Sequence, residues 1–182
     1  IINQVQAMKR MVDDFRDYAR LPTPDVVPLD LNELIGEVLG LYESSSATIS
    51  LELAVDLPPI LGDATQLRQV IHNLLRNAED ALEGDGSGRI SIATRANSRH
   101  AELLITDNGP GFPAEILPRI FEPYVTTKAK GTGLGMPIVK KIVDEHQGTI
   151  EISNAPEGGA RICIRLPLVK EEEAKHGNNS GR

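Results

Sequence analysis

Two asparagines form the first residue pair whose types and spacing suit chemistry. Asn73 and Asn77 are four positions apart in a stretch of helical periodicity, so both amides project from one face of a helix. An amide oxygen suits Mg²⁺, which in nucleotide sites takes few protein ligands and completes its shell with phosphate and water. Two asparagines are equally typical of a helix cap or an exposed helix surface. Alone, the pair therefore indicates little.

A second candidate is the segment 107–112, which reads Asp-Asn-Gly-Pro-Gly-Phe and follows an alternating apolar stretch. Asp107 stands at a strand end, where a pocket can open, and a buried carboxylate there can accept a hydrogen bond from an exocyclic amine such as that of adenine. Gly109 and Gly111 allow the backbone to approach a flat base closely. As an isolated motif, Asp-Asn-Gly is simply a turn.

A third candidate, residues 128–135, precedes a helix predicted to begin near Pro137. Glycines before a helix N-terminus leave N–H groups free to face an anion, and the lysines add mobile positive charge. The segment matches neither Gly-x-x-x-x-Gly-Lys-Ser/Thr nor the dinucleotide fingerprint, because its third glycine is misplaced and no strand directly precedes it. Its predicted phosphate-binding residues are Lys128, Lys130, Gly131, Thr132, Gly133, Leu134 and Gly135.

The elements that must position these residues follow from capping and periodicity. Asp30 and Asp63 each begin a capping signature, which predicts one helix to about residue 43 and a longer one carrying both asparagines. Residues 138–145 predict another helix, whereas 107–136 lack a sustained period, as functional segments often do. Strict alternation predicts strands at 49–53, 90–94, 102–106, 149–153 and 161–166.

The N-terminal segment has a different pattern. Val5, Met8, Val12, Phe15 and Ala19 recur at steps of three and four, which predicts a helix with one apolar seam. Such a seam implies a partner helix from a second copy or from other sequence, or else packing on its own domain. The Pro-rich residues 21–24 that follow favour separation from the rest.

Composition sets the outer bounds. A chain of 182 residues with 40% hydrophobic and 3% aromatic residues predicts one aliphatic core. The formal net charge of −7 argues against nucleic acid as a partner, because such binders need a cationic surface. Cys163 is the only cysteine, so no intrachain disulfide can form, and we interpret it as a strand residue. No apolar run approaches the roughly 20 residues that span a bilayer.

Taken in order, the motifs resemble the catalytic and ATP-binding domain of sensor histidine kinases. Residues 73–78 resemble the N box of that family, and 107–111 resemble its first glycine box. Phe121-Glu122-Pro123-Tyr124 looks like the F box, and 131–135 looks like the second glycine box. Residues 126–128, the short lid and residues 155–161 are most similar to the nitrogen-regulation kinases of the NtrY type.

The resemblance implies an α+β fold, a two-layer α/β sandwich in which a mixed sheet lies under helices. This Bergerat or GHKL fold is shared with gyrase, Hsp90 and MutL. We expect residues 1–20 to be the second helix of a dimerisation and phosphotransfer hairpin, 21–29 a linker, 30–169 the catalytic and ATP-binding domain, and 170–182 a disordered tail.

The resemblance also implies roles for single residues. Asn77 would hold Mg²⁺, and Asn73 would position phosphate or metal-bound water. Asp107 would bind the adenine amine, and Gly109 and Gly111 would shape the base pocket. The lid would contact phosphates, with Asn73, Asn77 and Lys128 as the catalytic set, while Phe121 would anchor the lid by packing.

The implied reaction is transfer of the ATP γ-phosphoryl group to a histidine outside this sequence, for relay to a response regulator. The family's His-Glu-type box is absent, and His72, His100, His146 and His176 lack its context. We expect a homodimer in the intact protein, at the cytoplasmic side of a membrane-anchored sensor whose membrane segments lie outside this sequence. The rival interpretations are a GHKL ATPase of the gyrase type, with a Glu base where Asn73 stands, and a degenerate module for dimerisation or partner contact.

Overall fold

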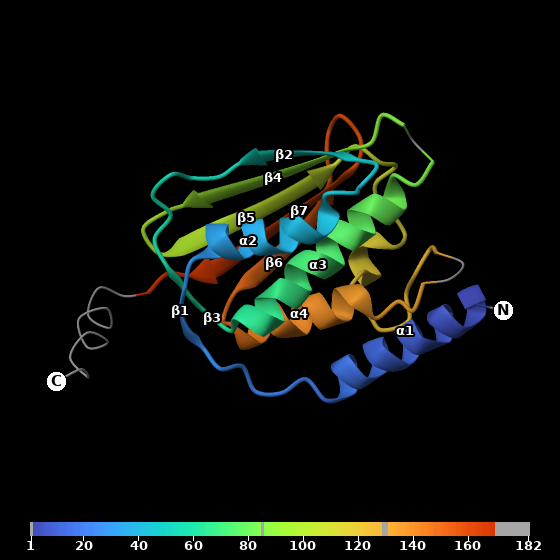
Figure 1. Cartoon of the computed structure of the whole chain (residues 1–182), viewed down its shortest axis with the longest axis horizontal. Coiled ribbons are helices and arrows are strands. Elements are labelled where there is room, and N and C mark those ends of the chain that lie inside the picture. Colours follow the sequence, from blue (N-terminus) through green and yellow to red (C-terminus); the bar gives the residue numbers. More distant parts are fainter. Residues whose placement is uncertain (1, 85, 129–130, 170–182) are drawn as a thin grey trace.

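A five-stranded sheet forms one layer and three helices form the other (Figure 1). The computed structural model describes residues 2–84, 86–128 and 131–169. The strand order is β2-β4-β5-β7-β6, in which β2 and β4 are parallel and every other neighbouring pair is antiparallel. The strands are β2 (Thr48–Glu52), β4 (Arg89–Ala96), β5 (His100–Asp107), β6 (Thr149–Asn154) and β7 (Ala160–Pro167). The predicted mixed sheet under helices is confirmed.

Alternation along the strands separates the two faces of this sheet. Along β5, Ala101, Leu103 and Ile105 are buried, while the residues between them are only half-buried. Leu103 pairs with Ile164 of β7, so the buried residues of neighbouring strands lie on the same face. That face carries the apolar core under α2 (Leu31–Leu39), α3 (Ala64–Ala81) and α4 (Gly135–Glu145).

Both predicted caps are present at helix N-termini. Asp30 accepts a hydrogen bond from the Glu33 N–H at 3.0 Å, which caps α2. Asp63 accepts from the N–H groups of Thr65 and Gln66 at 2.9 and 3.1 Å, which caps α3. The α2 helix ends earlier than predicted and continues as the short 3₁₀ helix η1 (Gly40–Tyr42); a second such helix, η2, spans Leu117–Arg119.

Two short strands were absent from the predicted elements. Val27–Leu29 (β1), in the segment interpreted as a linker, pairs antiparallel with Ile60–Gly62 (β3). Three-residue strands are too short to show a period, so only their pairing defines them. The α4 helix begins at Gly135, two residues before the predicted start, which places the end of the last glycine run inside a helix.

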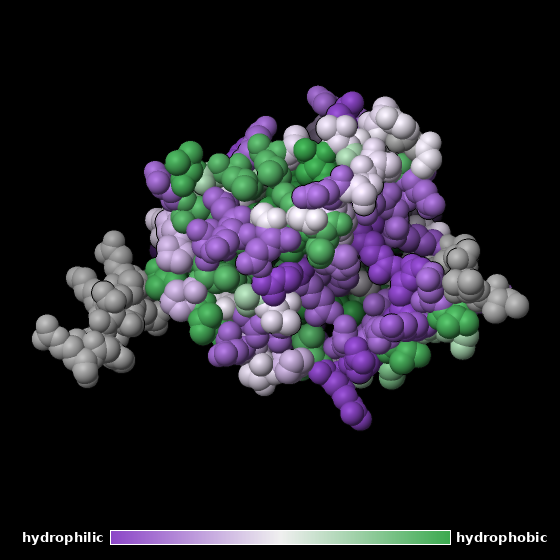
Figure 2. Space-filling model, viewed as in Figure 1, coloured by the Kyte–Doolittle hydropathy of each residue, from purple (hydrophilic) through white to green (hydrophobic). Residues whose placement is uncertain are grey.

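The N-terminal helix α1 (Ile2–Ala19) lies beside the helical layer, and Figure 1 shows it next to α4. One face of α1 contacts the rest of the chain. Asp17 accepts a 2.9 Å hydrogen bond from Gln69 of α3, and Tyr18 packs against the core. The seam faces away, with Met8 69% and Val12 65% exposed. Figure 2, drawn in the same view, shows exposed apolar side chains among hydrophilic ones at the lower right, where Figure 1 shows α1. The chain's own domain therefore does not cover the seam.

None of the helices in the described ranges is both long and apolar enough to cross a membrane. The predicted disordered tail, residues 170–182, lies outside those ranges, as do Lys130 and His176.

Candidate functional site

Asp107 ends β5, the third strand of the sheet, and is 7% exposed. Its Oδ1 accepts hydrogen bonds from the N–H of Gly109 at 2.9 Å and from that of Ala160 at 3.2 Å. Within the described residues, Oδ2 has no hydrogen-bond partner. The carboxylate is thus held by one oxygen and presents the other as an acceptor, an arrangement that fits an exocyclic amine.

Glycines line the backbone around this carboxylate. A Cβ on Gly109 would lie 3.0 Å from Asp107 Oδ1 and 3.2 Å from the Ala81 carbonyl oxygen. Gly111 has a φ of +73°, and its Cβ would lie 2.7 Å from Asn154 Oδ1. Asn154 in turn joins Phe112 through two hydrogen bonds of 2.8 Å. The first glycine box is therefore fitted tightly between α3 and the end of β6.

Sequence reasoning missed Gly159 and Ala160 as parts of this site. Gly159 has a φ of +92°, and a Cβ there would collide with the Asp107 carbonyl group. The only sequence signal was the Gly158-Gly159 pair, which indicates a turn and gives no hint of a contact some fifty positions away. The pairing of β5 with β7 brings the two segments together.

The two asparagines lie on α3, half-buried and on one face. Asn77 Oδ1 accepts a hydrogen bond from Lys128 Nζ at 3.2 Å, and its Nδ2 donates to Met136 Sδ at 3.4 Å. Asn77 thereby joins α3 to α4 and to residues 125–128 and 131–134, which we call the lid. The Asn73 side chain forms no hydrogen bond with any other described residue.

The ammonium group of Lys128 marks a place on α3 where a cation is stabilised. Its Nζ also lies 2.7 Å from Asp80 Oδ2, so an amide oxygen and a carboxylate oxygen contact the same positive charge. Oxygen donors of these two kinds are those that Mg²⁺ takes in proteins. The residues present thus fit the metal predicted beside Asn77, and Asp80, which the sequence analysis passed over, belongs to the same cluster.

The lid folds back on the F-box segment. Tyr124 donates its N–H to the Gly133 carbonyl at 3.0 Å, and both residues have positive φ, 65° and 67°. A Cβ on Gly133 would lie 2.5 Å from the Tyr124 carbonyl carbon, so only glycine fits there. Phe121 is partly buried against the core. Thr132 Oγ1 donates to Asp14 Oδ2 of α1 at 2.7 Å.

The lid leads into a helix start without a side-chain cap. Leu134, which precedes α4, is 1% exposed, and its carbonyl oxygen accepts a hydrogen bond from the Ile138 N–H at 3.0 Å. Among the described residues, no side chain caps the N–H groups of Gly135 and Met136, and Pro137 has no N–H. Such a start can receive an anion through N–H groups and the helix dipole. Gly131 turns tightly before it, since its Cβ would lie 2.5 Å from Thr126 Oγ1.

Two of the described histidines, His146 and His72, have side-chain hydrogen bonds within the fold. His146 is 3% exposed, accepts from the Asp63 N–H through Nε2 at 2.9 Å and donates from Nδ1 to the Ile142 carbonyl at 2.8 Å. His72 Nδ1 lies 2.8 Å from the Tyr42 hydroxyl. Burial, together with the Arg76 charge, lowers the pKa of His72, and burial raises the pKa of Tyr42 to about 12.

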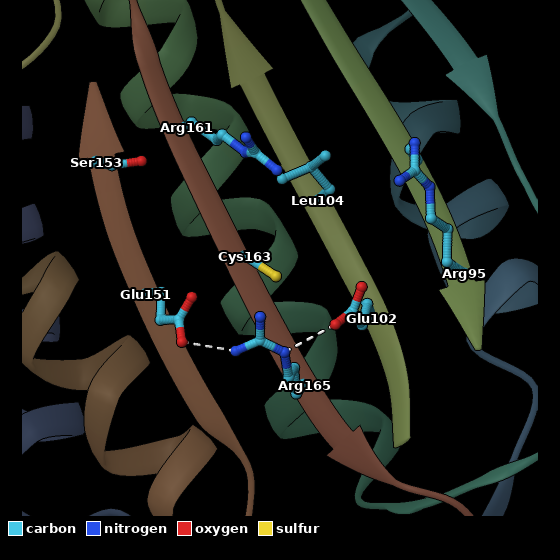
Figure 3. A pocket seen from close by; sticks show the side chains of 9 residues that line it. Arg95, Glu102, Leu104, Glu151, Ser153, Arg161, Cys163 and Arg165 are labelled. Atoms are coloured by element: carbon cyan, nitrogen blue, oxygen red, sulfur yellow. Dashed lines mark hydrogen bonds and ion pairs between the residues drawn. The ribbon is translucent and has the colours of Figure 1, made fainter. Parts of the chain in front are cut away.

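A hollow of about 270 Å³ lies on the outer face of the sheet, and Figure 3 looks onto it with a helix behind the strands. Arg165 spans it, with Nε 2.8 Å from Glu102 and another guanidinium nitrogen 2.7 Å from Glu151. Cys163 lies between them on β7, where burial raises its thiol pKa. The hollow is separated from the asparagines by the sheet itself. A second hollow, about 750 Å³, flanks α3 beside Tyr42 and His72.

Comparison with known proteins assigns the chain to a family. Residues 62–170 match the family described as histidine kinase-, DNA gyrase B-, and HSP90-like ATPase. The chain is 38% identical, over its whole length, to a putative sensor histidine kinase NtrY-like protein of Rickettsia felis and covers 30% of it. It is 40% identical, over 94% of its length, to the nitrogen regulation protein NtrY of Azorhizobium caulinodans and covers 23% of it. The chain thus spans less than a third of either relative.

Solved structures give the same match. The nucleotide-free catalytic domain of histidine kinase ThkA superposes with a TM-score of 0.72 at 32% identity, over 79% of this chain and 96% of that one. ShkA in complex with AMPPNP gives a TM-score of 0.77 at 26% identity, over 88% and 36%. ThkA in complex with the response regulator TrrA gives 0.76 at 29% identity, over 92% and 49%.

Proposed function

The chain belongs to the family of histidine kinase-, DNA gyrase B- and HSP90-like ATPases, as an ATP-binding domain of the sensor histidine kinase type, and we propose that it binds Mg-ATP between Asp107 and the lid. The carrying observation is the Asp107 carboxylate, fixed through Oδ1 with Oδ2 left as an acceptor. The intact protein would transfer the γ-phosphoryl group to a histidine outside this chain, for relay to a response regulator.

The base and the phosphates would be held by different elements. Asp107 Oδ2 accepts the adenine amino group, while Gly109 keeps space for the flat base between β5 and α3. The N–H groups at the start of α4 receive phosphate oxygens. Asn77 would hold a bound Mg²⁺, which would neutralise phosphate charge. Catalysis then rests on positioning and charge neutralisation rather than on a covalent intermediate.

In this proposal, the intact protein forms a homodimer through α1. Its exposed seam supports a homodimer built through a helical hairpin, in a protein whose remaining length would carry the acceptor histidine. A relative of the same fold, ThkA, is found in complex with a response regulator, which supports such a regulator as partner. We place this domain on the cytoplasmic side of a membrane-anchored sensor.

Isothermal titration with Mg-ADP tests the adenine assignment. Asp107→Asn removes a charge-assisted hydrogen bond, worth about 1.5–3 kcal/mol, so we expect the Kd to rise roughly 10- to 100-fold. Asp144→Asn, which changes an exposed carboxylate on α4, is the matched control and should leave the Kd unchanged. An Asp107→Asn protein that binds Mg-ADP as tightly as the wild type would overturn the assignment.

Hydrolysis distinguishes the kinase from the gyrase-type rival. Asn73 occupies the helix face where that rival carries a Glu base, and an amide cannot take a proton from water. We therefore expect this chain to bind ATP without steady release of phosphate. Continuous hydrolysis in the absence of an acceptor histidine would favour an ATPase instead, and absence of any adenine nucleotide binding would favour a degenerate module.

A further inference from the structure

Lys128 bridges the lid to α3 through two oxygen atoms on one helix face. Its Nζ is 3.2 Å from Asn77 Oδ1 and 2.7 Å from Asp80 Oδ2. Asn77 and Asp80 are three positions apart, so their side chains are neighbours on the helix surface. The Lys128 and Asp80 side chains are 37% and 42% exposed, which leaves both able to move and open to solvent.

We propose that Lys128 and the divalent cation exchange at one site, which we call the seat. It is formed by Asn77 Oδ1 and Asp80 Oδ2, and both oxygens contact whichever cation is present. The proposal rests on the nucleotide function proposed above. In the ligand-free chain the ammonium group occupies the seat. When Mg-nucleotide binds, Asn77 Oδ1 and Asp80 Oδ2 would contact the metal and Lys128 would leave them.

Charge and ligand capacity make the two occupants mutually exclusive. Both need the same Asn77 oxygen, and an ammonium group beside a divalent cation is repelled by it. Asp80 supplies what the neutral amide lacks, because Mg²⁺ in nucleotide sites is bound through one or two carboxylates together with phosphate. Asn77 and Asp80 alone make a weak site, which a lysine can hold until phosphate adds further ligands.

The exchange would also set the position of the lid. A lysine ammonium is a compact charge on a flexible four-carbon stem, so it can move from an oxygen pair on α3 to a phosphate without refolding the chain. Once released by the metal, Lys128 is free for the phosphate contact that its place in the lid predicts. Binding of metal-nucleotide and departure of the lid from α3 then become one event.

Binding of Mn²⁺ alone, measured by electron paramagnetic resonance on the nucleotide-free chain, tests the exchange. Lys128→Met empties the seat and should tighten Mn²⁺ binding by about two- to fivefold, the factor that matches the free energy of an exposed ion pair. Adding Asp80→Asn to that variant should abolish the gain. Lys140→Met is the matched control, since Lys140 is 38% exposed and pairs with Asp144 on α4.

Equal Mn²⁺ affinity in the wild type and Lys128→Met would overturn the proposal. An equal gain in Lys140→Met would also overturn it, because any uncovered carboxylate would then suffice. As a second measurement, we expect Asp80→Asn to reduce the factor by which Mg²⁺ tightens ADP binding, and an unchanged factor would remove Asp80 from the site. Failure of the exchange would leave ADP binding and its dependence on Asp107 intact, whereas failure of the proposed function would remove nucleotide binding itself.

Discussion

Among single residues, those around the proposed base site make contacts between segments far apart in the chain. Gly159 shows this most directly, because a side chain there would collide with the Asp107 carbonyl. Gly158 has a similar positive φ, +99°, but open space around its Cβ position. The two neighbours therefore separate the cost of backbone strain from the cost of a collision.

We expect Gly159→Ala to destabilise the fold more than Gly158→Ala. Both substitutions incur the positive-φ penalty of about 1–2 kcal/mol, and Gly159→Ala adds an overpacking cost of about 1–3 kcal/mol. Urea unfolding gives the two free energies of unfolding, and Mg-ADP titration should show weaker binding only for Gly159→Ala, because its collision displaces Asp107. Equal effects of both variants would contradict this reading of the contact.

The residues that sequence could and could not identify differ in one physical respect. Asp107 and Asn77 could be predicted as candidates because their positions relative to a strand end and a helix face are local properties of the sequence. Gly159 and Asp80 were missed because their roles depend on contacts with residues roughly fifty positions away, Asp107 and Lys128. The hydrophobic periodicity of one segment does not indicate which distant segment will pack against it.

At the scale of elements, the helix caps and the long strands could be predicted from local sequence, whereas the two-stranded sheet of β1 and β3 could not. The α3 cap was predicted from its first four residues, and β5 from its own alternation. The pairing of β1 with β3 depends on where α2 and α3 place the chain, so three residues of sequence could not predict it. The start of α4 at Gly135 was missed because glycine has a low intrinsic helix propensity.

Asp63 supports the helix that carries both asparagines, and its removal should be costly. It accepts from Thr65 and Gln66 through Oδ1 and from the Asp25 N–H through Oδ2 at 2.9 Å. We expect Asp63→Ala to lower the free energy of unfolding by about 1–2 kcal/mol at neutral pH. Asp30→Ala removes a cap with one N–H partner and should cost less.

The effect of Asp63 should depend on pH in a defined direction. Burial disfavours its charged form, but the N–H groups of Asp25, Gln66 and Thr65 outweigh burial and hold its pKa below the ordinary 3.8. A depressed folded-state pKa contributes stability that is present above the unfolded pKa and is lost as pH falls through the folded value. The difference between wild type and Asp63→Ala should therefore be constant near neutral pH and shrink below pH about 4 in acid titrations followed by urea unfolding. A difference that grows in acid would contradict the assignment.

At the scale of the whole molecule, the apolar seam of α1 is exposed to solvent. Val5, Met8, Val12 and Phe15 are each more than half exposed, while the opposite face of the helix is held by Asp17 and Tyr18. Apolar surface arranged as a continuous stripe at heptad spacing is stabilised by packing against a second helix. In the part of the chain that the structure describes, α2, α3 and α4 are already packed on the sheet and leave the seam uncovered.

We therefore expect the chain to self-associate through this seam, and Phe15→Glu to weaken the association. Phe15 is 54% exposed, so a charge there costs little in the monomer but would be desolvated between two helices. Val55→Glu is the matched control, since Val55 is 95% exposed and lies just beyond β2, outside the seam. Sedimentation velocity over a concentration series should show a shift towards monomer for Phe15→Glu alone, with the free energy of unfolding of each monomer unchanged. If both glutamates weakened association equally, net charge rather than the seam would account for it, and α1 would lose its role in joining two copies.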